Sequence, residues 1–101
     1  MENKKQEKIA EVFVVRRTSK IEYDFSVETV FYGCFKSKER AVALAKKEFE
    51  KLVQKYKEEE GLEVEQDYSF QYNRAIATLC FGEEEDFERH TVSIDIVKFI
   101  D

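Results

Sequence analysis

One stretch of this chain has the apolar spacing of an amphipathic helix. Its apolar residues recur every three or four positions and fall on one helical stripe: Ala41, Val42, Ala45, Phe49, Leu52, Val53 and Tyr56. Ser37 precedes the stretch and suits an N-cap, because its hydroxyl accepts a backbone N–H of the first turn. Gly61 follows it and suits the left-handed conformation that ends many helices. We therefore expect a single long helix from about Lys38 to Glu60, against which the other elements pack.

Two strand-like segments precede the predicted helix. Val12–Val15 is β-branched and aromatic, and the polar residues Thr18–Lys20 after it predict a hairpin turn. Ile21–Phe35 begins with alternating apolar and polar residues, which indicates a half-buried strand, and becomes apolar on both faces towards its end. Gly33 in this segment indicates a bulge or a close approach of another backbone. The pattern predicts two strands, the second of them long.

Two further strands are expected after the helix. Apolar residues occupy even positions from Tyr68 to Tyr72 and odd positions from Ala75 to Phe81. This change of phase indicates either a β-bulge or a turn at Asn73–Arg74, and we favour one bulged strand. The last strand is expected from about Arg89 to Ile100. The order is strand, strand, helix, strand, strand: an α+β domain of ββαββ type, in which an antiparallel sheet of about four strands packs on one long helix. We expect residues 1–101 to form a single domain with a flexible segment at 1–8.

The charge is distributed unevenly along the chain. Residues 1–57 hold 14 basic and 9 acidic residues, a net charge of +5, whereas residues 58–101 hold 3 basic and 13 acidic residues, a net charge of −10. The acidic half contains a cluster that we predict to contact a partner: Glu83, Glu84, Glu85, Asp86 and Glu88. Overall acidity argues against direct nucleic-acid binding, which depends on clustered Lys and Arg. The alternative is that these charges only solvate a helix and loops.

Apolar residues on both faces of several strands indicate a second buried surface. One helix covers one face of an antiparallel sheet, so the other face should be polar unless something packs on it. We expect this surface to include Tyr32, Cys34, Val97 and Phe99, and to be covered by a second copy in a homodimer, by the N-terminal segment or by a partner protein. The alternative is a strongly twisted sheet that buries part of its own second face.

No catalytic, cofactor or metal motif stands out, so we expect a non-enzymatic protein with no cofactor. Cys34 and Cys80 lack metal or redox spacing and are expected to be buried free thiols in a reducing compartment. His90 is expected at the surface; the alternative is a general base oriented by Glu88 or Asp95. The acidic run at 83–86 has the oxygens for a hard cation but not the spacing of a cation loop. No apolar stretch is long enough to span a membrane, and we expect a cytoplasmic location.

The segment Val30–Ala41, which reads Val-Phe-Tyr-Gly-Cys-Phe-Lys-Ser-Lys-Glu-Arg-Ala, resembles a pattern in small bacterial and phage proteins. In those proteins a strand of the form VFGVF runs into S-x-E-K-A and a long helix. Cys34 departs from the small aliphatic residue usual there. The resemblance implies a strand-strand-helix unit and a phage or mobile-element origin, and it brings no catalytic residues.

The function expected from these features is protein–protein contact. The acidic half suits a basic partner, such as a nucleic-acid-binding host protein, and electrostatic complementarity would also speed association. We therefore expect a phage inhibitor of a host defence protein, anti-CRISPR-like or otherwise anti-defence. The alternatives are a homodimeric bacterial housekeeping domain, a small-ligand binder at a dimer cleft and an enzyme that uses His90.

Overall fold

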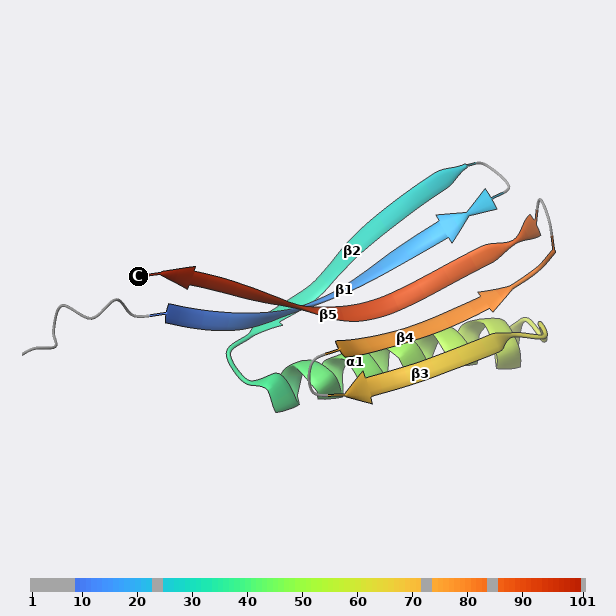
Figure 1. The fold of residues 1–101 in the computed structure, drawn as a ribbon. Helices are drawn as coiled ribbons and strands as arrows, with labels where there is room; N and C mark the ends of the chain where they lie inside the picture. Colours follow the sequence, from blue (N-terminus) through green and yellow to red (C-terminus); the bar gives the residue numbers. More distant parts are fainter. Residues whose placement is uncertain (1–8, 23–24, 72–73, 84–85, 101) are drawn as a thin grey trace, which may run out of the picture.

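The computed structural model describes residues 9–22, 25–71, 74–83 and 86–100, with the backbone alone at positions 9, 68–71, 74–76 and 99–100. Its elements are β1 (Ile9–Ile21), β2 (Ser26–Phe35), α1 (Lys38–Val53), the π-helical segment η3 (Gln54–Glu59), β3 (Glu65–Gln71), β4 (Arg74–Phe81) and β5 (Glu88–Ile100). The strands form one antiparallel sheet in the order β2-β1-β5-β4-β3 (Figure 1). The α+β class is confirmed, but the sheet has five strands rather than about four. The prediction for residues 1–8 lies outside the described residues.

The helix begins and ends close to the predicted residues. Ser37 is the N-cap, and its Oγ accepts a hydrogen bond from the backbone N–H of Arg40 at 3.3 Å. The last turns widen into η3, where the N–H of Glu60 donates to the carbonyl of Lys55 at 3.1 Å. Gly61 then adopts a φ of +68°, and the N–H of Leu62 donates to the carbonyl of Tyr56 at 2.9 Å. This left-handed ending is the one that the sequence predicted.

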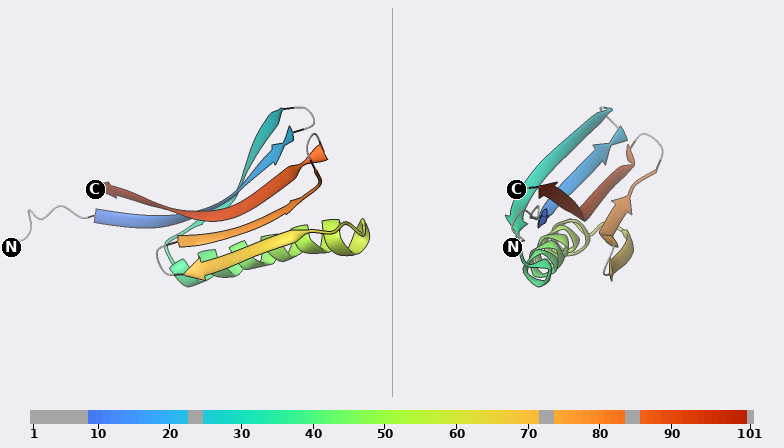
Figure 2. Two further views of the ribbon diagram at one scale, coloured as in Figure 1. Left: turned by 45° about the vertical axis from the view of Figure 1, so that its right-hand side comes forward. Right: turned by 60° about the vertical axis from the view of Figure 1, so that its left-hand side comes forward.

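The core lies between α1 and the concave face of the sheet. Figure 2 shows the sheet curving around the helix, and none of the described elements covers its convex face. The apolar stripe of α1 meets side chains of β1, β4 and β5, and the buried residues are Phe13, Val15, Ala41, Ala45, Phe49, Leu52, Ala77, Leu79 and Val92. The small residues Ala41 and Ala45 let the helix approach closely. A Cβ on Gly33 would lie 3.1 Å from Cε2 of Phe35 and 3.2 Å from Cδ2 of Leu44, so a larger residue there would require these side chains to shift slightly.

The first hairpin differs from the prediction. β1 continues through Thr18–Lys20 to Ile21, and the chain turns between Ile21 and Ser26. The alternation that we assigned to a strand starting at Ile21 therefore crosses a turn. Phe25, in that turn, has a positive φ of 55° and is 90% exposed. The apolar residues on the two sides of the turn lie on opposite faces of the sheet, so they do not share a buried side.

The second hairpin also corrects a prediction. Gln71 pairs with Arg74, so β3 and β4 are two strands joined by a two-residue connection, and not one bulged strand. Across such a connection an even-numbered residue pairs with an odd-numbered one, as Phe70 pairs with Ala75. Residues on one face therefore change from even to odd at the turn. The phase change that we interpreted as a bulge is the signature of this hairpin. The bulge lies instead in β2 at Tyr32, opposite Val15 and Arg16.

One end of the central strand pair extends past the other strands. β1 pairs with β5 from Ile9 to Ile21, but β2 pairs with β1 only from Phe13 onward, and β4 reaches only as far as Ile94 of β5. Residues 9–12 and 97–100 thus form a two-stranded ribbon, which projects beyond the helix in Figure 2. Among the described residues, no helix has the length and apolar character needed to span a membrane.

Candidate functional site

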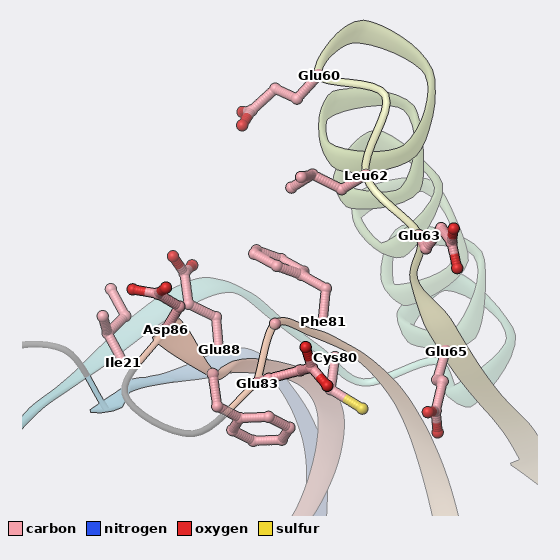
Figure 3. Close-up of a pocket in the computed structure, with 12 residues that line it drawn as sticks. Ile21, Glu60, Leu62, Glu63, Glu65, Cys80, Phe81, Glu83, Asp86 and Glu88 are labelled. Atoms are coloured by element: carbon pink, nitrogen blue, oxygen red, sulfur yellow. The ribbon is translucent and has the colours of Figure 1, made fainter.

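An open groove of about 880 Å³ lies at the C-terminal end of the helix (Figure 3). Three segments enclose it: the connection from η3 to β3, the end of β4, and the segment that leads into β5. Six carboxylate side chains line it, from Glu60, Glu63, Glu65, Glu83, Asp86 and Glu88. Apolar side chains complete the lining, from Ile21, Leu62, Cys80, Phe81 and Phe87. The groove therefore combines strong negative charge with an apolar floor.

The acidic walls are held by backbone geometry. Gly82 has a φ of +88°, and a Cβ there would lie 2.2 Å from the carbonyl oxygen of Asp86. The N–H of Asp86 donates to the carbonyl of Glu83 at 2.9 Å, and the N–H of Glu22 donates to the carbonyl of Phe87 at 3.0 Å. These bonds fasten the acidic segment to the end of β1. On the opposite wall, the left-handed Gly61 turns the chain from η3 towards β3.

Few ionisable partners surround the carboxylates of the groove in the described part of the chain. Among the described residues, Glu88 alone of the six has a charged or ionisable partner, since its Oε1 lies 3.0 Å from Nε2 of His90. Several acidic residues outside the groove do have such partners: Arg16 binds Asp95, and Arg17 lies 2.8 Å from Glu28. Lys20 lies 3.2 Å from Glu22. The groove therefore gathers six carboxylates with little compensating positive charge among the described residues.

Figure 3 shows how the charged side chains are placed around the groove. Glu60 and Glu63 extend from the segment after the helix, whereas Asp86 and Glu88 lie across the groove near Ile21. The ring of Phe81 lies between these two sets. A ligand that enters this space meets carboxylates on two sides and an aromatic surface below. That arrangement suits a cation that carries an apolar portion, such as a Lys or Arg side chain.

His90 is buried beside the groove, which corrects the surface location expected from the sequence. It is 3% exposed, and its ring stacks on Tyr56 with centroids 4.8 Å apart and on Phe81 at 6.0 Å. Its Nδ1 lies 2.7 Å from Oγ of Ser19. Burial lowers the pKa of His90 below its ordinary value, and the hydrogen bond to Glu88 opposes this shift. The neutral ring with its proton on Nε2 satisfies both contacts, donating to Glu88 and accepting from Ser19.

Ser19, His90 and Glu88 form a hydrogen-bonded series with the residue types of a hydrolase triad, but the geometry does not suit nucleophilic catalysis. Ser19 is 2% exposed, so its hydroxyl is closed to a substrate. Both ring nitrogens of His90 are occupied, which leaves none to activate Cys80 in the groove. Asp95, the other proposed orienting group, binds Arg16 instead. The series therefore anchors β1 to β5 and holds Glu88 at the groove wall.

The structure brings together part of the predicted acidic site. Glu83, Asp86 and Glu88 line the groove, while Glu84 and Glu85 lie outside the described residues. The sequence prediction did not include Glu60, Glu63 and Glu65. The sequence did hold one indication of an acidic site at Glu60. Glu58, Glu59 and Glu60 lie at the C-terminal end of the helix, where the helix dipole disfavours negative charge. The described residues contain no group of three or more His, Cys, Asp or Glu side chains that could hold a metal ion.

The predicted apolar contact residues do not form one surface. Tyr32 sits at the β2 bulge and packs against the core on the helix side, where burial raises its pKa. Cys34 pairs with Val14 and Val97 pairs with Val12, which places both on the convex face. The side chain of Phe99 lies outside the described residues. The thiols are also not buried as expected, since Cys34 is exposed and Cys80 is half-buried.

No protein family matches this chain, and no curated protein or solved structure gives a significant match.

Proposed function

We propose that this chain is a non-enzymatic binding protein whose acidic groove receives a basic, partly apolar segment of a partner protein. The observation that carries the proposal is the composition of the groove: six carboxylates and five apolar side chains among the described lining residues, which include no Lys or Arg. Lys and Arg side chains match both features, because a cationic head is joined to an apolar stem. Unpaired surface carboxylates also accelerate association with a positively charged partner.

The preorganised walls support binding rather than passive solvation. A charged loop that only keeps a protein soluble needs no fixed backbone, whereas here Gly82 is required by contact with Asp86 and Phe87 is tied to Glu22. Rigid placement of charges reduces the entropy lost when a ligand binds. The buried Ser19–His90–Glu88 series favours the same proposal, because its hydrogen bonds fix the position of Glu88, which lines the groove.

The narrower proposal concerns what the partner does. Basic protein surfaces with this chemistry commonly contact nucleic-acid phosphates. We infer that a segment of such a surface, once held in the acidic groove, is withheld from nucleic acid, so that the chain acts as an inhibitor. The prediction that the inhibitor is phage-encoded and directed at a host defence protein rests on the sequence resemblance and stays a prediction.

A peptide titration tests the proposal. The probe is a fluorescently labelled peptide of alternating Lys and Leu, with a Glu and Leu peptide as the reference. The test variant carries Glu60→Gln, Glu63→Gln and Asp86→Asn. The control carries Glu39→Gln, Glu50→Gln and Asp67→Asn, which change the net charge equally at exposed positions outside the groove.

We expect the Lys-containing peptide to bind the natural chain and the control with similar affinity, and the groove variant about tenfold more weakly or worse. Equal losses in the two variants would mean that net charge, rather than the groove, attracts the peptide. Binding of the Glu-containing peptide would also contradict the proposal. The groove variant then serves as the negative control when a partner is captured from host lysate and tested for loss of DNA or RNA binding.

A further inference from the structure

Between Val27 and Phe31 the edge strand β2 has few of the features that normally keep a sheet edge from pairing. It forms one side of the sheet and pairs with β1 alone among the described strands. Natural edges are blunted by Lys, Pro, β-bulges or inward-pointing charges, and the bulge of β2 lies at Tyr32, outside this stretch. The ten residues of β2 contain no Lys and no Pro, and their one charged side chain, Glu28, is held by Arg17 at 2.8 Å. The backbone groups on the outer side of β2 are therefore open to another strand.

Two of the three most exposed large apolar residues described lie on this edge. Val27 is 66% exposed and Phe31 is 69% exposed, and the two lie on the convex face with Thr29 between them. The bulge at Tyr32 ends the regular part of the strand, so the segment that can pair regularly around Thr29 is Val27–Phe31. Side chains at alternate positions of an edge supply the specificity when a strand is added to a sheet.

The opposite edge has the opposite character. β3 carries Glu65 and Asp67, both exposed, and Glu65 lines the acidic groove. In an antiparallel pair of two β3 strands centred on Gln66, Glu65 of each copy would lie opposite Asp67 of the other, which destabilises cross-strand pairing. The β2 edge has no such like-charge pair in the register centred on Thr29.

We propose that β2 pairs antiparallel with β2 of a second copy, around a two-fold axis at Thr29, so that the two sheets become one. This register places Val27 of each copy opposite Phe31 of the other and forms two apolar cross-strand pairs. It places Glu28 opposite Val30. Moving the axis by one residue to Glu28 would set the two Glu28 carboxylates against each other. The pairing uses the same edge in both copies, so the assembly closes as a dimer.

The second copy is the occupant that this edge fits best, because the segment is complementary to itself. A partner of strong charge would find no opposing charge on the outer side of β2, since Glu28 is already paired. The apolar residues Val27 and Phe31 are symmetric about Thr29, the middle of the five-residue stretch that they enclose. Aromatic and β-branched residues form favourable cross-strand pairs, which is the combination this register produces twice.

The test measures mass by light scattering after size exclusion, with the full chain at about 10 and 100 μM, a range chosen to bracket the micromolar affinities of modest interfaces. The natural chain is expected to approach twice its 12.0 kDa mass. Val27→Lys with Phe31→Lys places like charges opposite each other twice, and we expect the dimer dissociation constant to rise about tenfold or more. Both side chains are already exposed, so the fold is expected to persist, and circular dichroism verifies this.

A charge-swapped variant tests the register itself. Val27→Lys with Phe31→Glu places opposite charges across the axis twice and is expected to dimerise better than the double Lys variant. Val97→Lys is the control, because Val97 is an exposed apolar residue of the same face but lies on the central strand β5. A natural chain that stays at 12.0 kDa at the higher concentration overturns the proposal. So does a dimer that Val97→Lys dissociates and the double Lys variant does not, since it would be packed face to face.

Discussion

The two sides of the sheet, one near β3 and β4 and the other at β2, differ in shape, in charge and in exposed apolar surface. Near β3 and β4 the surface is hollow and lined by six carboxylates, of which Glu88 alone has an ionisable partner among the described residues. At β2 the surface is a flat strand edge with exposed Val27 and Phe31, and its one charge is neutralised by Arg17. We propose that the first surface binds a cationic partner, whereas the second pairs with a strand like itself.

This difference indicates how one small sheet could bind a basic partner at one side and a second copy at the other, because the two sides differ in charge. Under the two proposals, a second copy is repelled by the acidic groove and pairs at the β2 edge, while a basic partner binds in the groove and gains little at the edge. Each association can then be removed without disturbing the other. The predictions below use that independence.

The largest effect is expected from Gly82→Ala. The substitution places a Cβ 2.2 Å from the carbonyl oxygen of Asp86 at a φ of +88°. We expect it to lower the free energy of unfolding by roughly 2–4 kcal/mol and to disturb the acidic wall. Gly61→Ala is the matched control, since its φ is +68° but no atom lies within 4 Å, and it should cost only about 1 kcal/mol. Urea titrations compare the two, and equal losses would contradict the steric role of Gly82.

Crossed variants are expected to separate the two surfaces. Glu60→Lys, Glu63→Lys and Asp86→Lys together should weaken binding of the Lys and Leu peptide about a hundredfold, because attraction becomes repulsion. The same variant should keep the dimer mass. The double Lys variant at Val27 and Phe31 should lose the dimer mass and keep its affinity for the peptide. Peptide anisotropy and light scattering give both readouts for each protein, and a variant that removed both associations would show that the surfaces are coupled.

Salt should affect the two associations differently. Raising ionic strength from about 0.05 M to 0.5 M shortens the Debye length from roughly 14 Å to 4 Å, so peptide binding in the groove should weaken about tenfold. Pairing through β2 involves no charge pair across the axis and should be unchanged or slightly stronger. Titrations at four salt concentrations measure both. A dimer that dissociates with salt would indicate that its interface includes the acidic groove.

The smallest effect is expected from pH, through His90. Burial lowers its pKa below the unfolded value of about 6.5, so the unfolded chain takes up the proton first as the pH falls. Stability should therefore decrease as the pH drops below about 6.5. The groups that face the ring are Glu88, Arg17 and Lys55, together with uncharged Ser19, Tyr56 and Phe81.

The chain has one histidine, so its ring resonances report this titration directly. We expect an NMR midpoint below 6.5, with the urea midpoint falling between pH 7 and pH 5.5. A ring that titrates at or above 6.5 would mean that Glu88 outweighs burial, and stability would then rise as the pH falls through that region.

Local sequence patterns predicted the helix and the class of fold. They failed at the two hairpin turns, which lack Gly and Pro. The stripe from Ala41 to Tyr56, the cap at Ser37 and the ending at Gly61 all correspond to the structure, because each depends on neighbours in sequence. The two hairpins were misplaced since neither turn contains Gly or Pro. In the second hairpin, the phase change at residues 71–74 held the correct information, but a bulge and a two-residue turn produce the same pattern.

The candidate site was only half predictable for a different reason. Glu83, Asp86 and Glu88 form a run in sequence and could be found as a cluster. Glu60, Glu63 and Glu65 join them only because β3 lies beyond β4 in the sheet, next to the end of the helix. His90 was expected at the surface because the sequence around a single polar residue does not indicate whether its side chain is buried. Ser19 and Tyr56, which enclose it, come from elements far away in sequence.

The position of β5 in the sheet has a consequence for how the chain folds. β5 lies between β1 and β4, and it comes last of the described elements in the chain. Before β5 is in place, β1–β2 and β3–β4 are two separate hairpins with no shared ladder. Each hairpin can form locally and quickly, but isolated hairpins are marginal. Joining them requires the long-range closure of β5 onto β1, so we expect that step to limit the folding rate.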